Sequence, residues 1–143
     1  MQKSGPIIVI EDDLEDQELL EETSKVLNYP NQVIFFSDGF KAIEYIEKTS
    51  VTPFLIISDV NMPTINGFEL QRKFRDNEIL RARCIPYLFL TTSAHPAMVR
   101  DAYAMATQGF FIKPNTMADL RDTIRRIIEY WQQCFSPEQY IVN

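Results

Sequence analysis

The chain has 143 residues, of which 45% are hydrophobic and 24% charged, as in one ordinary globular domain. Its formal net charge of −6 disfavours nonspecific binding to nucleic acid or to an anionic membrane, because both would repel it at long range. With one histidine and two cysteines at unrelated spacing, neither a His-rich metal site, nor a Cys–His catalytic pair, nor a disulfide framework is expected.

Short apolar runs alternate with longer amphipathic segments along the chain. In chain order they predict strand 6–10, helix 14–27, strand 32–36, helix 39–49, strand 54–58, helix 67–76, strand 86–90, helix 96–106, strand 109–112 and helix 117–135. In the first helix, Leu19, Leu20, Thr23, Val26 and Leu27 recur at helical spacing. The segment 77–85 receives no assigned structure or role.

The predicted strands are nearly continuously apolar rather than alternating, which is typical of a parallel sheet covered by helices on both faces. Right-handed crossovers between successive strands then give a doubly wound α/β sandwich. Such sheets bind ligands beyond the carboxyl ends of their strands. The residues that directly follow the strands are therefore the candidate site.

The sequence also indicates where the protein resides. Residues 1–6 lead directly into an apolar strand without the pattern of a signal peptide. The apolar run 53–57 is far shorter than the ~20 residues of a membrane span. We therefore expect a soluble cytoplasmic protein with residues 1–143 as one domain, its core over about 6–134 and a tail over 135–143.

Four acidic residues follow the first and third strands. Asp59 alone fits a turn aspartate that bonds its own backbone, while Asp13, and by the same argument Asp12, fits an acid at a helix N-terminus. If the two strands are neighbours, however, Glu11, Asp12 and Asp59 converge. Carboxylates about 4 Å apart repel by roughly 4 kcal/mol at an effective dielectric near 20, so a compensating cation or strongly basic neighbours are needed. Hard oxygen ligands without histidine or thiolate suit Mg²⁺.

Two further strand ends carry complementary chemistry. Thr91 ends the fourth strand with a hydroxyl that can bond an oxyanion, and Lys113 follows the fifth with a cation that can pair with Asp59 at rest and with a phosphoryl group later. Each signal alone is weak, because both residue types also occur in caps and turns. Together, four of the five strand ends indicate phosphoryl chemistry.

With these motifs, essentially the whole chain resembles a two-component response-regulator receiver domain. Glu11 and Asp12 correspond to its acidic pair, and the pattern Asp-Val-Asn-Met-Pro…Asn-Gly at 59–67 corresponds to its phosphoacceptor loop. The separation between Thr91 and the Lys-Pro pair that begins at Lys113 also fits. The resemblance implies a flavodoxin-like fold with strand order 2-1-3-4-5.

The resemblance also implies roles for individual residues. Asp59 would accept a phosphoryl group from the phosphohistidine of a sensor histidine kinase or histidine phosphotransfer protein, and Lys113 and Thr91 would bind the phosphoryl oxygens. The implied Mg²⁺ ligands are Glu11, Asp12, Asp59 and the backbone carbonyl of Asn61. Movement of Thr91 would let Phe110 swing inward. The face formed by 96–106, 109–112 and 117–135 would then change for a downstream protein, a relay partner or a second copy.

The chain departs from the family pattern at a few positions. Asn66 replaces the more usual aspartate, and both residue types tolerate a left-handed turn. Phe110 lacks a tyrosine hydroxyl, so a switch there would work by packing alone. Thr92 occupies a position that is often alanine or glycine and would narrow access to Asp59. The family's Lys-Pro bond, here after Lys113, is usually cis. In its acid-rich first helix, the chain resembles the stand-alone receivers of bacterial phytochrome-type systems.

Two other functions compete with this interpretation. A haloacid-dehalogenase-like phosphohydrolase also uses a strand-end aspartate, Mg²⁺, a hydroxyl and a lysine, but its nucleophile normally follows the first strand and a second aspartate lies two residues on. Here Asp59 follows the third strand and Asn61 takes the second position. The other alternative is a receiver-like binding module that works without phosphorylation, which the intact set of acceptor, metal ligands and lysine disfavours.

Overall fold

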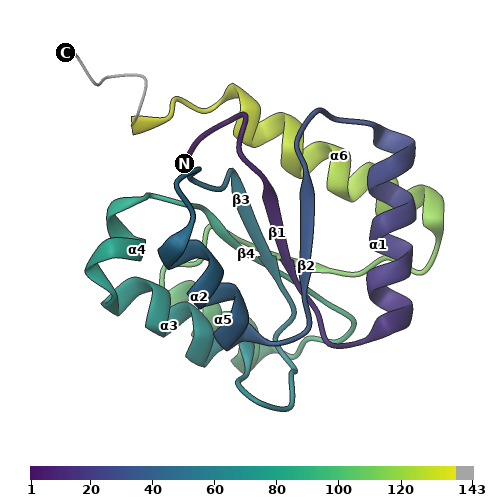
Figure 1. Ribbon diagram of the computed structural model, residues 1–143. Helices are drawn as coiled ribbons and strands as arrows, with labels where there is room; N and C mark the ends of the chain where they lie inside the picture. Colours follow the sequence, from purple (N-terminus) through teal and green to yellow (C-terminus); the bar gives the residue numbers. More distant parts are fainter. Residues whose placement is uncertain (138–143) are drawn as a thin grey trace.

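Five parallel strands form one sheet in the order β2-β1-β3-β4-β5, with helices on both faces (Figure 1). The structure is a computed structural model and describes residues 1–137. The strands are β1 Ile7–Ile10, β2 Val33–Phe36, β3 Leu55–Ser58, β4 Tyr87–Thr91 and β5 Gly109–Ile112. The helices are α1 Leu14–Leu27, α2 Gly39–Lys48, α3 Gly67–Asp76, α4 Glu78–Ala82, α5 Pro96–Ala104 and α6 Met117–Gln133. The predicted doubly wound sheet and its strand order are confirmed.

The helix α4 is the one element that the sequence analysis did not predict. It begins after Asn77, whose side chain accepts a hydrogen bond from the Leu80 backbone N–H at 3.1 Å. Leu80 is buried in the core. A helix of five residues is too short to display the 3.6-residue repeat that identified the other helices.

The helices divide the core into two layers. In Figure 1, α1 and α6 lie on one face of the sheet, while α2, α3 and α5 lie on the other. On the first face, Leu20 of α1 belongs to the same core cluster as four residues of α6, Leu120, Ile124, Ile127 and Ile128. The predicted stripe of α1 was partly wrong, because Leu19 and Val26 are 40% and 60% exposed. Because those two side chains are largely exposed, α1 packs against the core through a narrower stripe than predicted.

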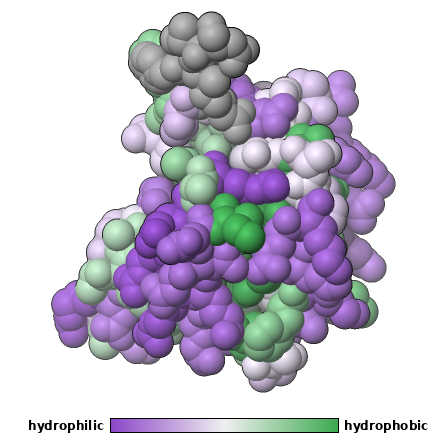
Figure 2. Space-filling model, turned by 60° about the vertical axis from the view of Figure 1, so that its left-hand side comes forward, coloured by the Kyte–Doolittle hydropathy of each residue, from purple (hydrophilic) through white to green (hydrophobic). Residues whose placement is uncertain are grey.

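The surface on the side of α3 and α4 is mostly hydrophilic, with a strip of hydrophobic surface between two hydrophilic regions (Figure 2). The tail predicted over 135–143 lies outside the described residues from residue 138 onward. Within residues 1–137, no helix has the length and apolar character needed to cross a membrane.

Gly67 is the first residue of α3, and it lies close to the backbone of Asp59 in the candidate site. A Cβ atom on Gly67 would lie 2.3 Å from the Asp59 backbone oxygen and 2.9 Å from a ring carbon of Phe89. We expect Gly67→Ala to lower the free energy of unfolding by about 1–3 kcal/mol, because the backbone must shift to relieve the overlap. Urea denaturation measures this loss. An unchanged midpoint would show that the loop accommodates a methyl group and would contradict the close contact.

Candidate functional site

Asp59 lies at the carboxyl end of β3, beside Glu11 at the end of β1. The two strands are neighbours in the sheet, and the Asp59 backbone N–H donates to the Ile10 carbonyl at 3.0 Å. Asp59 is only 8% exposed, and its Oδ1 accepts a hydrogen bond from the Val60 backbone N–H at 2.7 Å. One carboxylate oxygen thus behaves as a turn aspartate. The other oxygen, Oδ2, faces Lys113, whose Nζ lies 3.8 Å away.

Glu11, Asp12 and Asp59 form the predicted cluster of acids. One carboxylate oxygen from each lies within 4.8 Å of the others, which is close enough for a shared ion. Glu11 and Asp59 are buried and Asp12 is half-buried. Three carboxylates so close together repel strongly without a cation. The donor set consists of hard oxygens from few protein groups, and it therefore fits Mg²⁺ or a similar divalent cation.

The carboxyl group of Glu11 has a raised pKa. Burial raises the pKa of its carboxyl to about 7, against the opposing effect of its hydrogen bond to Lys113 and with a further rise from the Asp59 charge. Its Oε1 accepts from the Asp13 backbone N–H at 3.1 Å, and its Oε2 accepts from Lys113 Nζ at 2.7 Å. Both oxygens of Glu11 are therefore already engaged by protein donors.

Lys113 pairs with Asp59, as predicted, and more closely with two further acids. Its Nζ lies 3.8 Å from Asp59 Oδ2 and donates to Glu11 at 2.7 Å and to Asp16 at 2.8 Å. Glu11 follows β1, whereas Asp16 approaches from α1. Burial alone would lower the Lys113 pKa, but the hydrogen bonds to Asp16 and Glu11 outweigh it and raise that pKa, so the ammonium stays charged.

Asp16 is the site residue that the sequence analysis missed. It lies three residues after Asp13, which caps α1 by accepting hydrogen bonds from the Glu15 and Asp16 backbone N–H groups at 2.9 and 3.2 Å. A side chain at this third helical position points back toward the helix N-terminus. That spacing was the available signal. The helix-cap interpretation is therefore correct for Asp13, whereas Asp12 belongs to the metal cluster.

Thr91 and Lys113 meet because β4 and β5 are neighbours. Thr91 pairs with Ile112, and the Lys113 backbone N–H donates to the Thr91 carbonyl at 2.7 Å. Thr91 is fully buried, and its hydroxyl makes a long hydrogen bond of 3.4 Å to the Ser93 carbonyl. The next residue, Thr92, is exposed. The structure thus brings Glu11, Asp12, Asp59, Thr91 and Lys113 to one edge of the sheet, as predicted.

Phe110 packs against a cluster of aromatic rings in the core. Its half-buried ring lies 5.9 Å from the ring of Phe89, measured between centroids. Phe89 in turn contacts Phe68 at 5.1 Å and Tyr87 at 5.3 Å. Any movement of Phe110 would therefore act through ring packing, in agreement with its lack of a hydroxyl.

One detail implied by the resemblance, a cis Lys-Pro bond, differs in the structure, and Asn66 does not use the left-handed conformation that it would tolerate. Asn66 has φ −75° and caps α3, with its side chain accepting from the Glu69 backbone N–H at 2.9 Å. An extended conformation is the one that an N-cap requires. No peptide bond among residues 1–137 is cis, so the Lys113–Pro114 bond is trans, the isomer that most X–Pro bonds prefer. The exposed Asn61 lies in the loop after Asp59, and its role as a carbonyl ligand stays a prediction.

Known proteins share this sequence pattern. A profile of the response regulator receiver domain matches residues 7–125. The probable methanogenesis regulatory protein FilR2 of Methanothrix harundinacea is 29% identical over 129 residues, which cover 87% of this chain and 82% of the relative. Response regulator Rcp1 of Synechocystis is 27% identical over 130 residues, which cover 87% of each protein.

Solved structures share the fold. The Mn²⁺-bound form of Rcp1 has a TM-score of 0.76 at 26% identity, and the match covers 91% of this chain and 96% of that one. The phosphorylated cyanobacterial phytochrome response regulator RcpA has a TM-score of 0.80 at 24% identity, covers 92% of this chain and 96% of that one, and is a likeness of fold. The profile match spans most of the sequence. The chain belongs to the response regulator receiver domain family.

Proposed function

We propose that this protein accepts a phosphoryl group on Asp59 in a Mg²⁺-dependent reaction and passes the signal on by protein contact or by phosphorelay. The observation that carries the proposal is the position of Asp59. Its Oδ2 faces the Lys113 ammonium at 3.8 Å, and its carboxylate belongs to the three-carboxylate cluster. A nucleophile, a cation and an oxyanion-binding hydroxyl at Thr91 are the parts that phosphoryl transfer to a carboxylate needs.

Different groups of this chain would take different parts in the phosphoryl transfer. The Val60 N–H fixes Asp59 Oδ1 and leaves Oδ2 to attack phosphorus. As the new O–P bond forms, the P–N bond of a phosphohistidine breaks and its electron pair returns to the imidazole. Lys113 would then exchange its bonds to Glu11 and Asp16 for phosphoryl oxygens, and the Thr91 hydroxyl would donate to another oxygen.

The metal would be held by the side chains of Glu11, Asp12 and Asp59 and by the Asn61 carbonyl. The support is the close approach of the three carboxylates, together with the Mn²⁺-bound form of the similar protein Rcp1. When bound, Mg²⁺ would supply positive charge that offsets both the carboxylates and the incoming phosphoryl oxygens. Its removal should therefore stop phosphorylation.

The output would be a change of surface at α5, β5 and α6. Thr91 ends β4 and Phe110 lies on β5, so movement of Thr91 toward the phosphoryl group would be transmitted to that face through ring packing. Receiver domains of this type pair with histidine kinases, and we infer a kinase or a histidine phosphotransfer protein as donor. A downstream protein or a second copy would bind the switched face. We place the protein in the cytoplasm as a single receiver domain, without nucleic-acid or membrane partners.

The test separates a phosphoacceptor from a hydrolase. Intact-mass spectrometry of the protein with acetyl phosphate and Mg²⁺ should show one added phosphoryl group per chain, and the label should be lost when EDTA replaces Mg²⁺. Phosphate release should be slow and limited by decay of that label. Continuous release over many turnovers at enzyme rates would favour the haloacid-dehalogenase-like alternative, and an unlabelled protein would favour a binding module.

Thr92 provides a kinetic prediction. It follows the buried Thr91 and is exposed where a donor must approach, and its β-branched side chain is stiff. We expect Thr92→Ala to speed phosphorylation severalfold with a phosphohistidine protein and less with acetyl phosphate, since ~1 kcal/mol of barrier changes a rate about fivefold. Rapid-quench mass spectrometry measures both rates, with Ser93→Ala as the control that should change little. A rate for Thr92→Ala equal to or below wild type would show that access is not limited at this position.

A further inference from the structure

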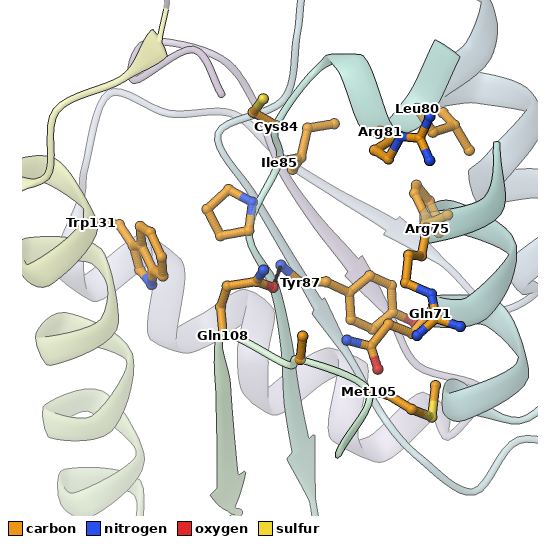
Figure 3. Close-up of a pocket in the computed structure, with 13 residues that line it drawn as sticks. Gln71, Arg75, Leu80, Arg81, Cys84, Ile85, Tyr87, Met105, Gln108 and Trp131 are labelled. Carbon is orange, nitrogen blue, oxygen red and sulfur yellow. Dashed lines mark hydrogen bonds between the residues drawn. The ribbon is translucent and has the colours of Figure 1, made fainter. Parts of the chain in front are cut away.

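A cavity lies at the edge of the sheet opposite to Asp59, and nothing in the proposed phosphoryl chemistry uses it (Figure 3). Its volume is about 370 Å³, within the range of pockets that hold small organic molecules. Pro86 and Tyr87 at the start of β4 and Gln108 before β5 line it, whereas Asp59 and Lys113 follow the other ends of their strands. An occupant would therefore not compete with the phosphoacceptor site.

The walls come from elements that are distant in the sequence. In Figure 3, Trp131 of α6 lies on one side, Gln71 and Arg75 of α3 lie on the other, and Arg81 of α4 lies above them. The helix α4 and the residues after it thus form one wall, which gives the unassigned segment 77–85 a structural role. Most of the lining is apolar or aromatic, with Phe74, Leu80, Ile85, Pro86, Tyr87 and Trp131.

Gln71, in the cavity wall, indicates which chemical group a ligand would have to provide. It is 5% exposed, and its side-chain carbonyl oxygen is buried without a hydrogen-bond partner among the described residues. The nearby Gln108 is satisfied, because its side-chain oxygen accepts from the Tyr87 backbone N–H at 2.9 Å. A buried acceptor of this kind is rare in native proteins unless a ligand or water donates to it. The missing partner is thus an N–H or O–H group.

The charge of the cavity determines the rest of the ligand. Arg75 and Arg81 both line it, and no aspartate or glutamate within residues 1–137 does, although the whole chain has a net charge of −6. The Arg75 side chain lies 3.6 Å from Asp76, but that pair is exposed and weak. Two guanidinium groups beside an apolar floor favour an anionic head group on an apolar body.

We propose that this cavity binds a flat, largely apolar organic anion that also carries an N–H or O–H donor. The anion would face Arg75 and Arg81, the donor would satisfy Gln71, and the apolar body would lie between Trp131 and the α3–α4 wall. The site is formed by residues outside the phosphoacceptor cluster, so the proposal is independent of the function assigned to Asp59.

The probe is 8-anilino-1-naphthalenesulfonate, which has a sulfonate, an anilino N–H and a flat aromatic body. We expect saturable one-to-one binding to the wild-type chain. Because Trp131 is the only tryptophan, its indole N–H gives a single NMR signal, which should shift during the titration. Arg75→Gln combined with Arg81→Gln should weaken binding about tenfold, as expected for lost charge-assisted hydrogen bonds. Gln71→Leu should weaken it severalfold.

Two controls locate the effect. Arg72→Gln removes an exposed charge from the same helix outside the cavity and should leave the affinity within about twofold. The neutral analogue N-phenyl-1-naphthylamine lacks the sulfonate and should bind wild type and the double variant alike. Urea midpoints of the variants confirm that they fold. The proposal is overturned if the probe does not bind saturably, if it binds without shifting the Trp131 signal, or if the double variant and Arg72→Gln bind it equally.

Discussion

Asp59→Asn is expected to abolish phosphoryl labelling by acetyl phosphate, with no added mass under conditions that label wild type fully. The amide has the size of the carboxylate and can still accept the Val60 N–H, so the loop should keep its shape. It lacks the anionic oxygen that faces Lys113 and attacks phosphorus. The loss should therefore be one of chemistry, with an unchanged urea midpoint or a modest increase as repulsion from Glu11 and Asp12 is relieved.

Asp38→Asn is the matched control for this variant. Asp38 follows β2 at the same edge of the sheet and caps α2, where its Oδ1 accepts from the Phe40 backbone N–H at 2.9 Å. Asparagine caps helices equally well, so the fold should be kept. Asp38→Asn should be labelled like wild type. Labelling that persists in Asp59→Asn would assign the acceptor to another residue.

Asp12→Asn is expected to weaken Mg²⁺ binding more than Glu11→Gln does. Both oxygens of Glu11 already accept hydrogen bonds from protein donors, whereas within residues 1–137 the Asp12 carboxylate accepts none and is half-buried beside the other two acids. We therefore expect Asp12 to bind the ion directly and Glu11 to act through water. We expect a loss of about 100-fold for Asp12→Asn and about tenfold for Glu11→Gln.

Isothermal titration with Mg²⁺ measures these affinities. Asp13→Asn removes the same charge one residue later and preserves the cap of α1, so it should bind Mg²⁺ nearly as wild type does. The opposite order of Asp12 and Glu11, or a large loss in Asp13→Asn alone, would mean that the acidic run is misaligned by one residue.

The sequence predicted the elements that have a clear period and missed what depends on geometry between elements. The strands and five helices were found because apolar runs and helical stripes are local signals. The helix α4 has no such signal in its five residues. Within α1, spacing alone assigned Leu19 and Val26 to the buried stripe, although only tertiary packing decides how wide that stripe is.

The candidate site shows the same division. Glu11, Asp12, Asp59, Thr91 and Lys113 were predictable because each follows or ends a strand, and parallel strands present these positions at one edge. One partner of Lys113, Asp16, was not predictable from strand ends, because it enters the site from α1. The opposite cavity, assembled from several elements, could be found only once the chain was folded.

The location of the acyl phosphate in the wild-type chain tests the central claim most directly. Borohydride reduces a phosphorylated aspartate to homoserine, which peptide mass spectrometry assigns to a single position. After treatment with acetyl phosphate and Mg²⁺, we predict homoserine at position 59, and none there when EDTA replaces Mg²⁺. An unmodified Asp59 in protein that carries a phosphoryl group, for example as a borohydride-resistant ester on Thr92, would contradict the account.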